Sequence, residues 1–125
     1  MPVLHYAKPI LKPKTNGKSV GNYCESSDVI NAIFLLLDKG ENGEIYNVVN
    51  ENNTMSILEM AELVVKHFAN EKIKVIVSPE NRGVTGYAPN TALRLSSEKI
   101  EKIGWKPQKD IISMYENIIA ILRKK

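Results

Sequence analysis

The chain has 125 residues, of which 43% are hydrophobic, and no apolar run is long enough to span a membrane. That length suits one compact domain with a hydrophobic core and is short for two. The net charge of +3 comes from 17 basic and 14 acidic residues. Because the basic residues are dispersed, apart from a short run at the C-terminus, neither a nucleic-acid partner nor a membrane partner is expected.

The single cysteine, Cys24, excludes an internal disulfide and cannot form a cysteine-based metal site alone. The N-terminus also lacks the uninterrupted apolar core of a signal peptide. Both features favour a reducing, cytoplasmic location, and no metal site is expected.

Residues 1–19 contain Pro2, Pro9 and Pro13 among scattered apolar side chains. Proline lacks a backbone N–H and restricts the preceding residue to extended conformations. This segment is therefore predicted to be an irregular arm, and residues 20–125 are predicted to form a single α/β domain.

The domain begins with a β-prone stretch, Val20–Cys24, followed by a helix that runs to Lys39 and ends at Gly40. Its capping candidates are Ser26, Ser27 and Asp28. The helix is apolar nearly all round, which predicts burial on several sides.

A strand is predicted over Glu44–Asn50, with apolar bulk from Ile45, Val48 and Val49. Ser56 and Glu59 then form a capping box ahead of a second helix, which ends near Phe68. Alternating apolar residues predict another strand over Ile73–Val77.

The loop Glu80–Asn90 leads into an extended piece, Ala92–Leu95. A small helix follows Ser96 or Ser97 and is closed by Gly104, where Trp105 is expected to pack. Asp110 caps the last helix, whose predicted apolar face contains Ile111, Tyr115, Ile118, Ile119 and Leu122. In total, the sequence predicts a small mixed α/β domain of about four helices and three to four short strands.

No dinucleotide site is predicted. Such a site needs a strand, a Gly-rich turn and then a helix, so that backbone N–H groups meet the pyrophosphate. Gly40 and Gly43 follow a helix and precede the predicted strand, which is the reverse order, and the other five glycines do not fit either. The chain is therefore predicted to hold no cofactor.

Several short motifs occur in a shared order, and the stretch Lys14–Asn50 is the most telling. The motifs are Asn22-Tyr23-Cys24 before Asp28-Val29, Gly40-Glu41-Asn42-Gly43-Glu44 before Tyr46-Asn47-Val48, Ser56-Ile57, Gly86-Tyr87-Ala88-Pro89, Ser97, Lys99 and Gly104-Trp105-Lys106-Pro107. In this order they resemble the C-terminal, substrate-binding lobe of NAD-dependent epimerases and dehydratases, which are extended short-chain dehydrogenase/reductases of the nucleotide-sugar type.

The resemblance implies the fold of that lobe without a Rossmann domain, and a UDP-, GDP- or dTDP-linked sugar as ligand. It implies that NAD or NADP belongs to a separate catalytic lobe. The family's proton-transfer pair, a Tyr with a Lys four residues later, occurs nowhere in this chain. No catalytic residue is therefore expected, and the chain is predicted to be inactive alone.

Two departures affect the expected ligand site. The family usually has phosphate-binding arginines where this chain has Gly21 and Ala92. Losing both would weaken diphosphate binding by several kcal/mol, at about 1.5–3 kcal/mol per charged hydrogen bond. Arg94 lies two residues after Ala92, a spacing that returns a strand side chain to the same face. It is either a partial substitute or a solvated strand arginine.

The candidate substrate-binding residues are thus Tyr87, Arg94, Asn22 and Tyr23. Tyr87 is equally compatible with packing. Cys24 is interpreted as a buried, inert cysteine rather than a reactive thiol. Asp28 and Glu25 could suggest acid/base chemistry, but Asp28 is better explained as an acid at the start of a helix.

Three functions remain open. The chain is a substrate lobe, as a domain or a fragment; a non-enzymatic module that binds a protein or itself; or, least favoured, an independent enzyme using Cys24 or the carboxylates. Removing a large neighbouring lobe would expose an apolar patch. The expected partners are therefore a sugar nucleotide, and either a second copy or the missing Rossmann lobe.

Overall fold

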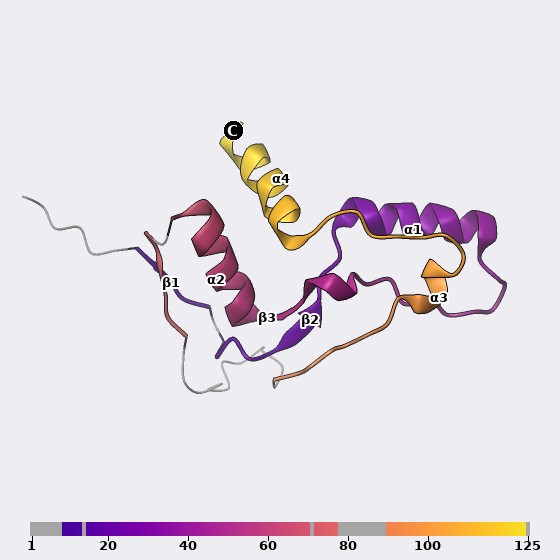
Figure 1. Cartoon of the computed structure of the whole chain (residues 1–125), viewed down its shortest axis with the longest axis horizontal. Helices are drawn as coiled ribbons and strands as arrows, with labels where there is room; N and C mark the ends of the chain where they lie inside the picture. The colour runs from indigo at the N-terminus through magenta and orange to yellow at the C-terminus, as the bar shows by residue number, and fades with distance from the viewer. Residues whose placement is uncertain (1–8, 14, 71, 78–89, 125) are drawn as a thin grey trace, which may run out of the picture. The chain divides into compact units, whose positions relative to one another are not determined.

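A computed structural model describes residues 9–13, 15–70, 72–77 and 90–124 (Figure 1). The chain divides into two compact units: unit 1 comprises residues 1–19 and 56–90, and unit 2 comprises residues 20–55 and 91–125. The described residues form four α-helices, one 3-10 helix and four short strands. This confirms the predicted mixed α/β class, while the domain boundary at residue 20 stays a prediction.

Unit 1 contains a short parallel sheet that sequence analysis did not predict. Strand β1 (Ile10–Leu11) pairs with β4 (Lys74–Val75), and the Lys74 N–H donates to the Pro9 carbonyl at 2.8 Å. Part of the proline-containing arm is therefore a strand rather than irregular chain. The predicted strand over Ile73–Val77 is shortened to the two residues of β4, which pair with Ile10 and Leu11, and the Ile76 N–H also donates to the Leu11 carbonyl at 3.1 Å.

Helix α2 (Ile57–Phe68) is the main element of unit 1. Its start confirms the predicted capping box: Ser56 accepts from the Glu59 N–H, and the Glu59 carboxylate accepts from the Ser56 N–H. Val65 is the buried residue of this helix.

Unit 2 is built around β2 (Val20–Asn22). This strand forms a two-stranded sheet with β3 (Thr54–Ser56), and Val20 also makes a parallel bridge to Ala92. The extended piece predicted after the loop is thus confirmed at Ala92. A 3-10 helix, η1 (Glu51–Asn53), precedes β3.

Helix α1 (Ser26–Lys39) ends at Lys39 as predicted, but its cap and burial differ from the prediction. Glu25, rather than a serine or Asp28, is the N-cap, because its carboxylate accepts from the Ser27 and Asp28 N–H groups. Gly40 ends the helix in an extended conformation, where a Cβ would lie 2.5 Å from the Leu36 carbonyl oxygen.

The expected burial of α1 on several sides is wrong. Asp28 and Ala32 are buried on one side. An opposite stripe at helical spacing is between 51% and 79% exposed, and it consists of Ile30, Ile33, Phe34 and Leu37. The apolar composition of α1 predicted burial on several faces, but the described residues cover only one of them.

The core of unit 2 combines a few apolar side chains with a buried carboxylate. Ala32, Ile100 and Trp105 form the buried cluster. The Trp105 indole N–H donates to the Asp28 carbonyl at 2.9 Å, which confirms that Trp105 packs here. The Asp28 carboxylate accepts from the N–H groups of Gln108, at 3.0 Å, and Lys109, at 2.9 Å. This carboxylate thereby joins α1 to the segment before the last helix.

The segment 44–50, predicted as a strand, is not one. Tyr46 and Val48 pack against the core cluster, but the segment has no partner strand among the described residues. A strand requires main-chain pairing as well as β-prone residues, and here only the second condition is met.

Two helices complete unit 2. Helix α3 (Glu98–Glu101) follows Ser97 and contributes the fully buried Ile100. Helix α4 (Ile111–Arg123) is capped by Asp110, as predicted. Of its predicted apolar face only Ile111 is buried, whereas Ile118 and Leu122 are exposed.

Asn53 fixes the start of α4. Its amide donates to the carbonyls of Tyr23 and Lys109, and its amide oxygen accepts from the Ile111 N–H. Asn53 is only 2% exposed, so these bonds are made away from water. None of the helices in the described part of the chain combines the length and apolarity needed to cross a membrane.

The role of the Asp28 carboxylate can be tested by comparing the stability of wild type and a charge-removing variant. Asp28→Asn keeps the side-chain size but removes the charge, so two charge-assisted bonds become neutral ones. We expect the free energy of unfolding, measured by urea denaturation, to fall by about 2 kcal/mol.

Asp38→Asn on the same helix is the matched control, because Asp38 is exposed near the C-terminus of α1. Its effect should stay within about 0.5 kcal/mol. Equal effects of the two substitutions would show that the buried carboxylate does not hold α1 in place.

Candidate functional site

The predicted ligand residues of unit 2 lie on two chain segments that run side by side. The Val20 N–H donates to the Thr91 carbonyl at 2.8 Å, and the Leu93 N–H donates to the Val20 carbonyl at 2.9 Å. These bonds bring β2, which contains Gly21, next to the segment that contains Ala92. The two positions at which the resemblance implies arginines are therefore on adjacent segments.

Asn22 connects these segments through its side chain. Its amide nitrogen donates to Thr54 Oγ1 on β3, and its amide oxygen accepts from the Leu95 N–H at 2.7 Å. Both ends of the amide are thus engaged within the protein. Asn22 shapes the site by joining three segments, whereas its role as a ligand contact stays a prediction. Thr54 was not singled out from the sequence, because only the pairing of β2 with β3 brings it here.

Tyr23 lies against the backbone of Gly21. A Cβ on Gly21 would be 3.5 Å from Cζ of the Tyr23 ring and 3.6 Å from its hydroxyl oxygen, so the ring occupies the space beside this glycine. Burial, followed by the proximity of Tyr115, raises the pKa of the Tyr23 hydroxyl above its usual value. Tyr23 therefore remains a neutral phenol at physiological pH. It presents a ring and a neutral hydroxyl where a cation is expected.

Arg94 is exposed, and no hydrogen bond or ion pair joins it to another residue of the described ranges. A guanidinium is charged at all physiological pH values and offers several fixed donors. Arg94 is therefore a cation available to an anion from solvent, two residues from Ala92. Tyr87, the fourth predicted residue, lies outside the described residues.

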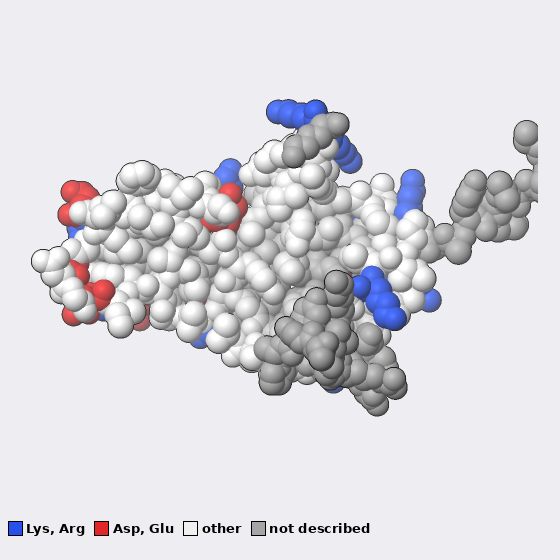
Figure 2. Space-filling view, turned by 180° about the vertical axis from the view of Figure 1, so that it is seen from behind, with Lys and Arg blue, Asp and Glu red and all other residues white. Residues whose placement is uncertain are grey.

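On the face that Figure 2 shows, lysine and arginine side chains are scattered among uncharged residues rather than aligned in a continuous stripe. No cluster of three or more potential metal ligands occurs within the described ranges. The site, as described, offers a single available cation and neutral hydrogen-bonding groups.

The two carboxylates considered for acid/base chemistry, Glu25 and Asp28, have structural roles. Glu25 caps α1, and its bond to the Ser27 side chain, more than its other contacts, lowers the pKa of its carboxyl group. Asp28 is saturated by the N–H groups of the segment before α4. Burial, followed by the charges of Asp28 and Glu25, raises the pKa of the Cys24 thiol to about 11. A thiol with this pKa is a poor nucleophile at neutral pH.

Cys24 provides a pH-dependent test of this assignment. At pH 8, a pKa of about 11 gives about 100-fold less thiolate than the ordinary value of 9.0. We expect the folded chain to react with a disulfide reagent at least about 50-fold more slowly than the urea-unfolded chain at this pH.

The raised pKa also affects stability. The folded state holds the thiol proton more tightly, so the stabilising contribution is fully present below pH 9 and is lost as the pH rises through about 11. The folded-state reaction rate should therefore rise steeply towards pH 11. Equal folded and unfolded rates at pH 8 would identify Cys24 as an accessible, activated thiol.

Curated proteins with similar sequences are sugar-nucleotide enzymes. The dTDP-D-glucose 4,6-dehydratase of Mus musculus is 34% identical over 93 residues, which are 70% of this chain and 24% of that protein. UDP-D-apiose/UDP-D-xylose synthase 1 of Arabidopsis thaliana is 27% identical over 121 residues, which are 88% of this chain and 31% of that protein. No family model matches the chain.

Solved structures with a similar fold include two with bound cofactor. RMD from Pseudomonas aeruginosa complexed with NADPH has a TM-score of 0.67 and 24% identity, over 87% of this chain and 33% of that one. The dTDP-glucose 4,6-dehydratase of Bacillus anthracis in complex with NAD has a TM-score of 0.65 and 21% identity, over 93% of this chain and 34% of that one. The chain therefore spans about a quarter to a third of the length of the proteins it matches.

Proposed function

We propose that this chain has the function of the lobe to which it corresponds, the C-terminal lobe of the NAD-dependent epimerases and dehydratases of nucleotide sugars. It is the substrate-binding lobe of such an enzyme and binds the diphosphate of a UDP-, GDP- or dTDP-linked sugar. It does not catalyse the reaction alone. The isomerase or lyase chemistry takes place when a nucleotide-binding lobe is joined to it.

The observation that carries this proposal is the pairing of β2 with residues 91–95. This pairing puts Gly21, Ala92 and Arg94 on adjacent segments, and Arg94 has no partner among the residues that the structure describes. An unpaired guanidinium beside main-chain and phenol groups suits a phosphate group. With one cation in place of two arginines, the affinity should be modest.

The cofactor does not fit this chain. A nicotinamide dinucleotide needs a Gly-rich turn between a strand and a helix, and none of the seven glycines has that sequence context. We therefore assign NAD or NADP to the separate lobe, and no step of the reaction to residues of this chain. A cytoplasmic location agrees with this assignment.

The proposed role of Arg94 can be tested by measuring ligand binding. A ligand that binds only the folded state raises the melting temperature, by an amount set by its concentration and affinity. We expect at least one of UDP-glucose, GDP-mannose and dTDP-glucose to stabilise the chain at millimolar concentration. Arg94→Ala should lower the affinity about 10- to 150-fold, as expected for one lost charged hydrogen bond.

Arg123→Ala is the matched control, because Arg123 is also an exposed arginine and lies at the end of α4. It should leave the thermal shift unchanged. A ligand response that survives Arg94→Ala would remove Arg94 from the site. The absence of a response to all three sugars would contradict the proposed ligand class.

The exposed apolar side chains favour a second function, that of a self-associating module without enzyme activity. The stripe on α1 and the exposed Ile118, Ile121 and Leu122 on α4 place seven large apolar side chains in solvent, and exposed apolar patches mark interaction surfaces. Sedimentation of the purified chain distinguishes the two functions. A stable dimer that ignores sugar nucleotides supports the module, whereas a monomer that binds them supports the lobe.

A further inference from the structure

The sequence contains two Asn-Gly pairs, Asn16-Gly17 and Asn42-Gly43. In such a pair the main-chain nitrogen of the glycine can attack the side-chain amide carbon of the asparagine, because glycine has no Cβ to hinder the approach. The reaction is intramolecular, so the geometry around each pair sets its rate. The structure gives the two pairs contrasting surroundings.

Asn16-Gly17 is held in a geometry that opposes this reaction. Asn16 is 7% exposed, and its amide oxygen accepts from the Lys18 N–H at 3.1 Å, which closes a local Asx-turn. The Gly17 N–H donates to Thr15 Oγ1 at 3.2 Å. A Cβ on Gly17 would lie 2.9 Å from Cβ of Leu58, so helix α2 packs directly on this glycine. Both reacting groups of this pair therefore have hydrogen-bond partners, and the packed chain leaves them little space to rotate.

Asn42-Gly43 lies in an open turn. Both residues are exposed, and no hydrogen bond joins the Asn42 side chain or the Gly43 N–H to another residue in the part of the chain that the structure describes. Apart from the chain neighbours of Gly43, no described residue comes within 4 Å of a Cβ placed on it. The same dipeptide therefore has both reacting groups available here, with space for a ring to form.

The turn 41–44 that contains this pair is closed by one main-chain bond, from the Glu44 N–H to the Glu41 carbonyl at 3.2 Å. Gly43 has a φ of +79°, the value expected at the third position of a type II turn. Ring closure requires the Gly43 nitrogen to rotate towards the Asn42 side chain, which opens this exposed bond. Local opening of an exposed turn costs much less free energy than global unfolding.

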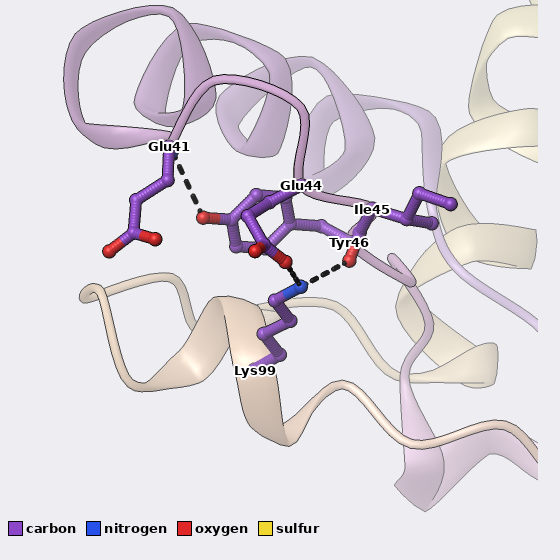
Figure 3. A network of polar contacts seen from close by, with 5 residues as sticks. All are labelled: Glu41, Glu44, Ile45, Tyr46 and Lys99. Carbon is purple, nitrogen blue, oxygen red and sulfur yellow. Dashed lines mark hydrogen bonds and ion pairs between the residues drawn. The ribbon is translucent and has the colours of Figure 1, made fainter.

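Both ends of the turn contact side chains of unit 2 (Figure 3). The Glu41 N–H donates to the Tyr46 hydroxyl at 3.1 Å. The Glu44 carboxylate forms an ion pair with Lys99, and Lys99 Nζ also donates to the Ile45 carbonyl at 2.9 Å. Lys99 lies 4.8 Å from the centre of the Tyr46 ring, and Tyr46 packs against the core cluster. A longer turn would therefore disturb residues that contact the core.

We propose that Asn42 is a site of spontaneous deamidation and that Asn16 is protected from it. The Gly43 nitrogen forms a bond with Cγ of Asn42, the bond from Cγ to the amide nitrogen breaks, and that nitrogen leaves as ammonia with the proton from Gly43. Water then opens the resulting succinimide ring at one of its two carbonyls. Attack at Cγ gives aspartate, whereas attack at the main-chain carbonyl gives isoaspartate, in which the chain runs through Cβ and Cγ.

Isoaspartate changes the turn in two ways. It adds one methylene group to the main chain, so the bond between Glu44 and Glu41 loses its geometry. It also adds a negative charge close to these two carboxylates, which repels them. The contact between Glu44 and Lys99 should weaken as a result. This modification goes beyond the proposed function, because it requires neither a sugar nucleotide nor a second lobe.

The test compares both pairs within one molecule. The full chain is incubated at mildly alkaline pH and digested, and mass spectrometry follows the conversion of amide to carboxylate in the peptides with Asn16 and Asn42. We expect Asn42 to react at least about tenfold faster than Asn16 in the folded chain. In urea, where both turns are lost, the two rates should agree within about threefold.

Asn42→Gln is the matched control, because its longer side chain keeps the amide but requires a larger ring. The peptide with residue 42 should then stay unmodified. Lys99→Met removes the contacts that hold the Glu44 end of the turn and should speed the reaction at Asn42. Lys102→Met should not, because the Lys102 side chain is 72% exposed and pairs only with Glu98 among the described residues.

The effect on the turn has its own readout. Isoaspartyl chains, separated by charge and counted with an isoaspartyl methyltransferase, should melt at a lower temperature than Asn42→Asp, which has the charge without the methylene. Equal melting temperatures would overturn the proposed effect on the turn, and so would a rate at Asn42 that Lys99→Met leaves unchanged. Equal rates at Asn16 and Asn42 in the folded chain, or no reaction at Asn42, would overturn the proposed site.

Discussion

The buried carboxylate of Asp28 is the constraint on which unit 2 depends. It accepts from two main-chain N–H groups of the segment before α4, while its own carbonyl accepts from Trp105. These bonds fix which side of α1 faces inward, because Asp28 and Ala32 lie one turn apart. The side that remains carries four large apolar residues in water. The Asp28 bonds therefore account both for the small core held by polar groups and for the uncovered helix face. Both features suit a lobe that packs against another surface.

The sequence predicted the features that depend on local chemistry. The capping box at Ser56, the cap at Asp110 and the end of α1 at Lys39 are set by neighbouring residues, and all three are confirmed. Features that depend on distant partners were not predictable. The β1–β4 pairing joins residues far apart in the chain, and the strand predicted at 44–50 has β-prone residues without a partner. Within the site, the positions of Gly21, Ala92 and Arg94 came from motif order. That both ends of the Asn22 amide are engaged required the pairing of three segments.

The segments with Gly21 and Arg94 provide a neutral surface with one available cation, which suits weak recognition of a phosphate group. The chain spans about a quarter to a third of the length of its relatives. The raised pKa of Cys24 and the structural roles of Glu25 and Asp28 argue against a nucleophilic or basic role for these three residues.

The central claim is that β2 and residues 91–95 form a sugar-nucleotide site. Titration of the isotope-labelled chain with dTDP-glucose, UDP-glucose and GDP-mannose, followed by amide chemical shifts, tests it at individual residues. The account predicts that at least one ligand shifts the amides of residues 21–23 and 91–95, and the Arg94 side-chain resonance, while the amides of α4 stay unchanged. A folded chain whose residues 21–23 and 91–95 do not respond to any of the three ligands would contradict it.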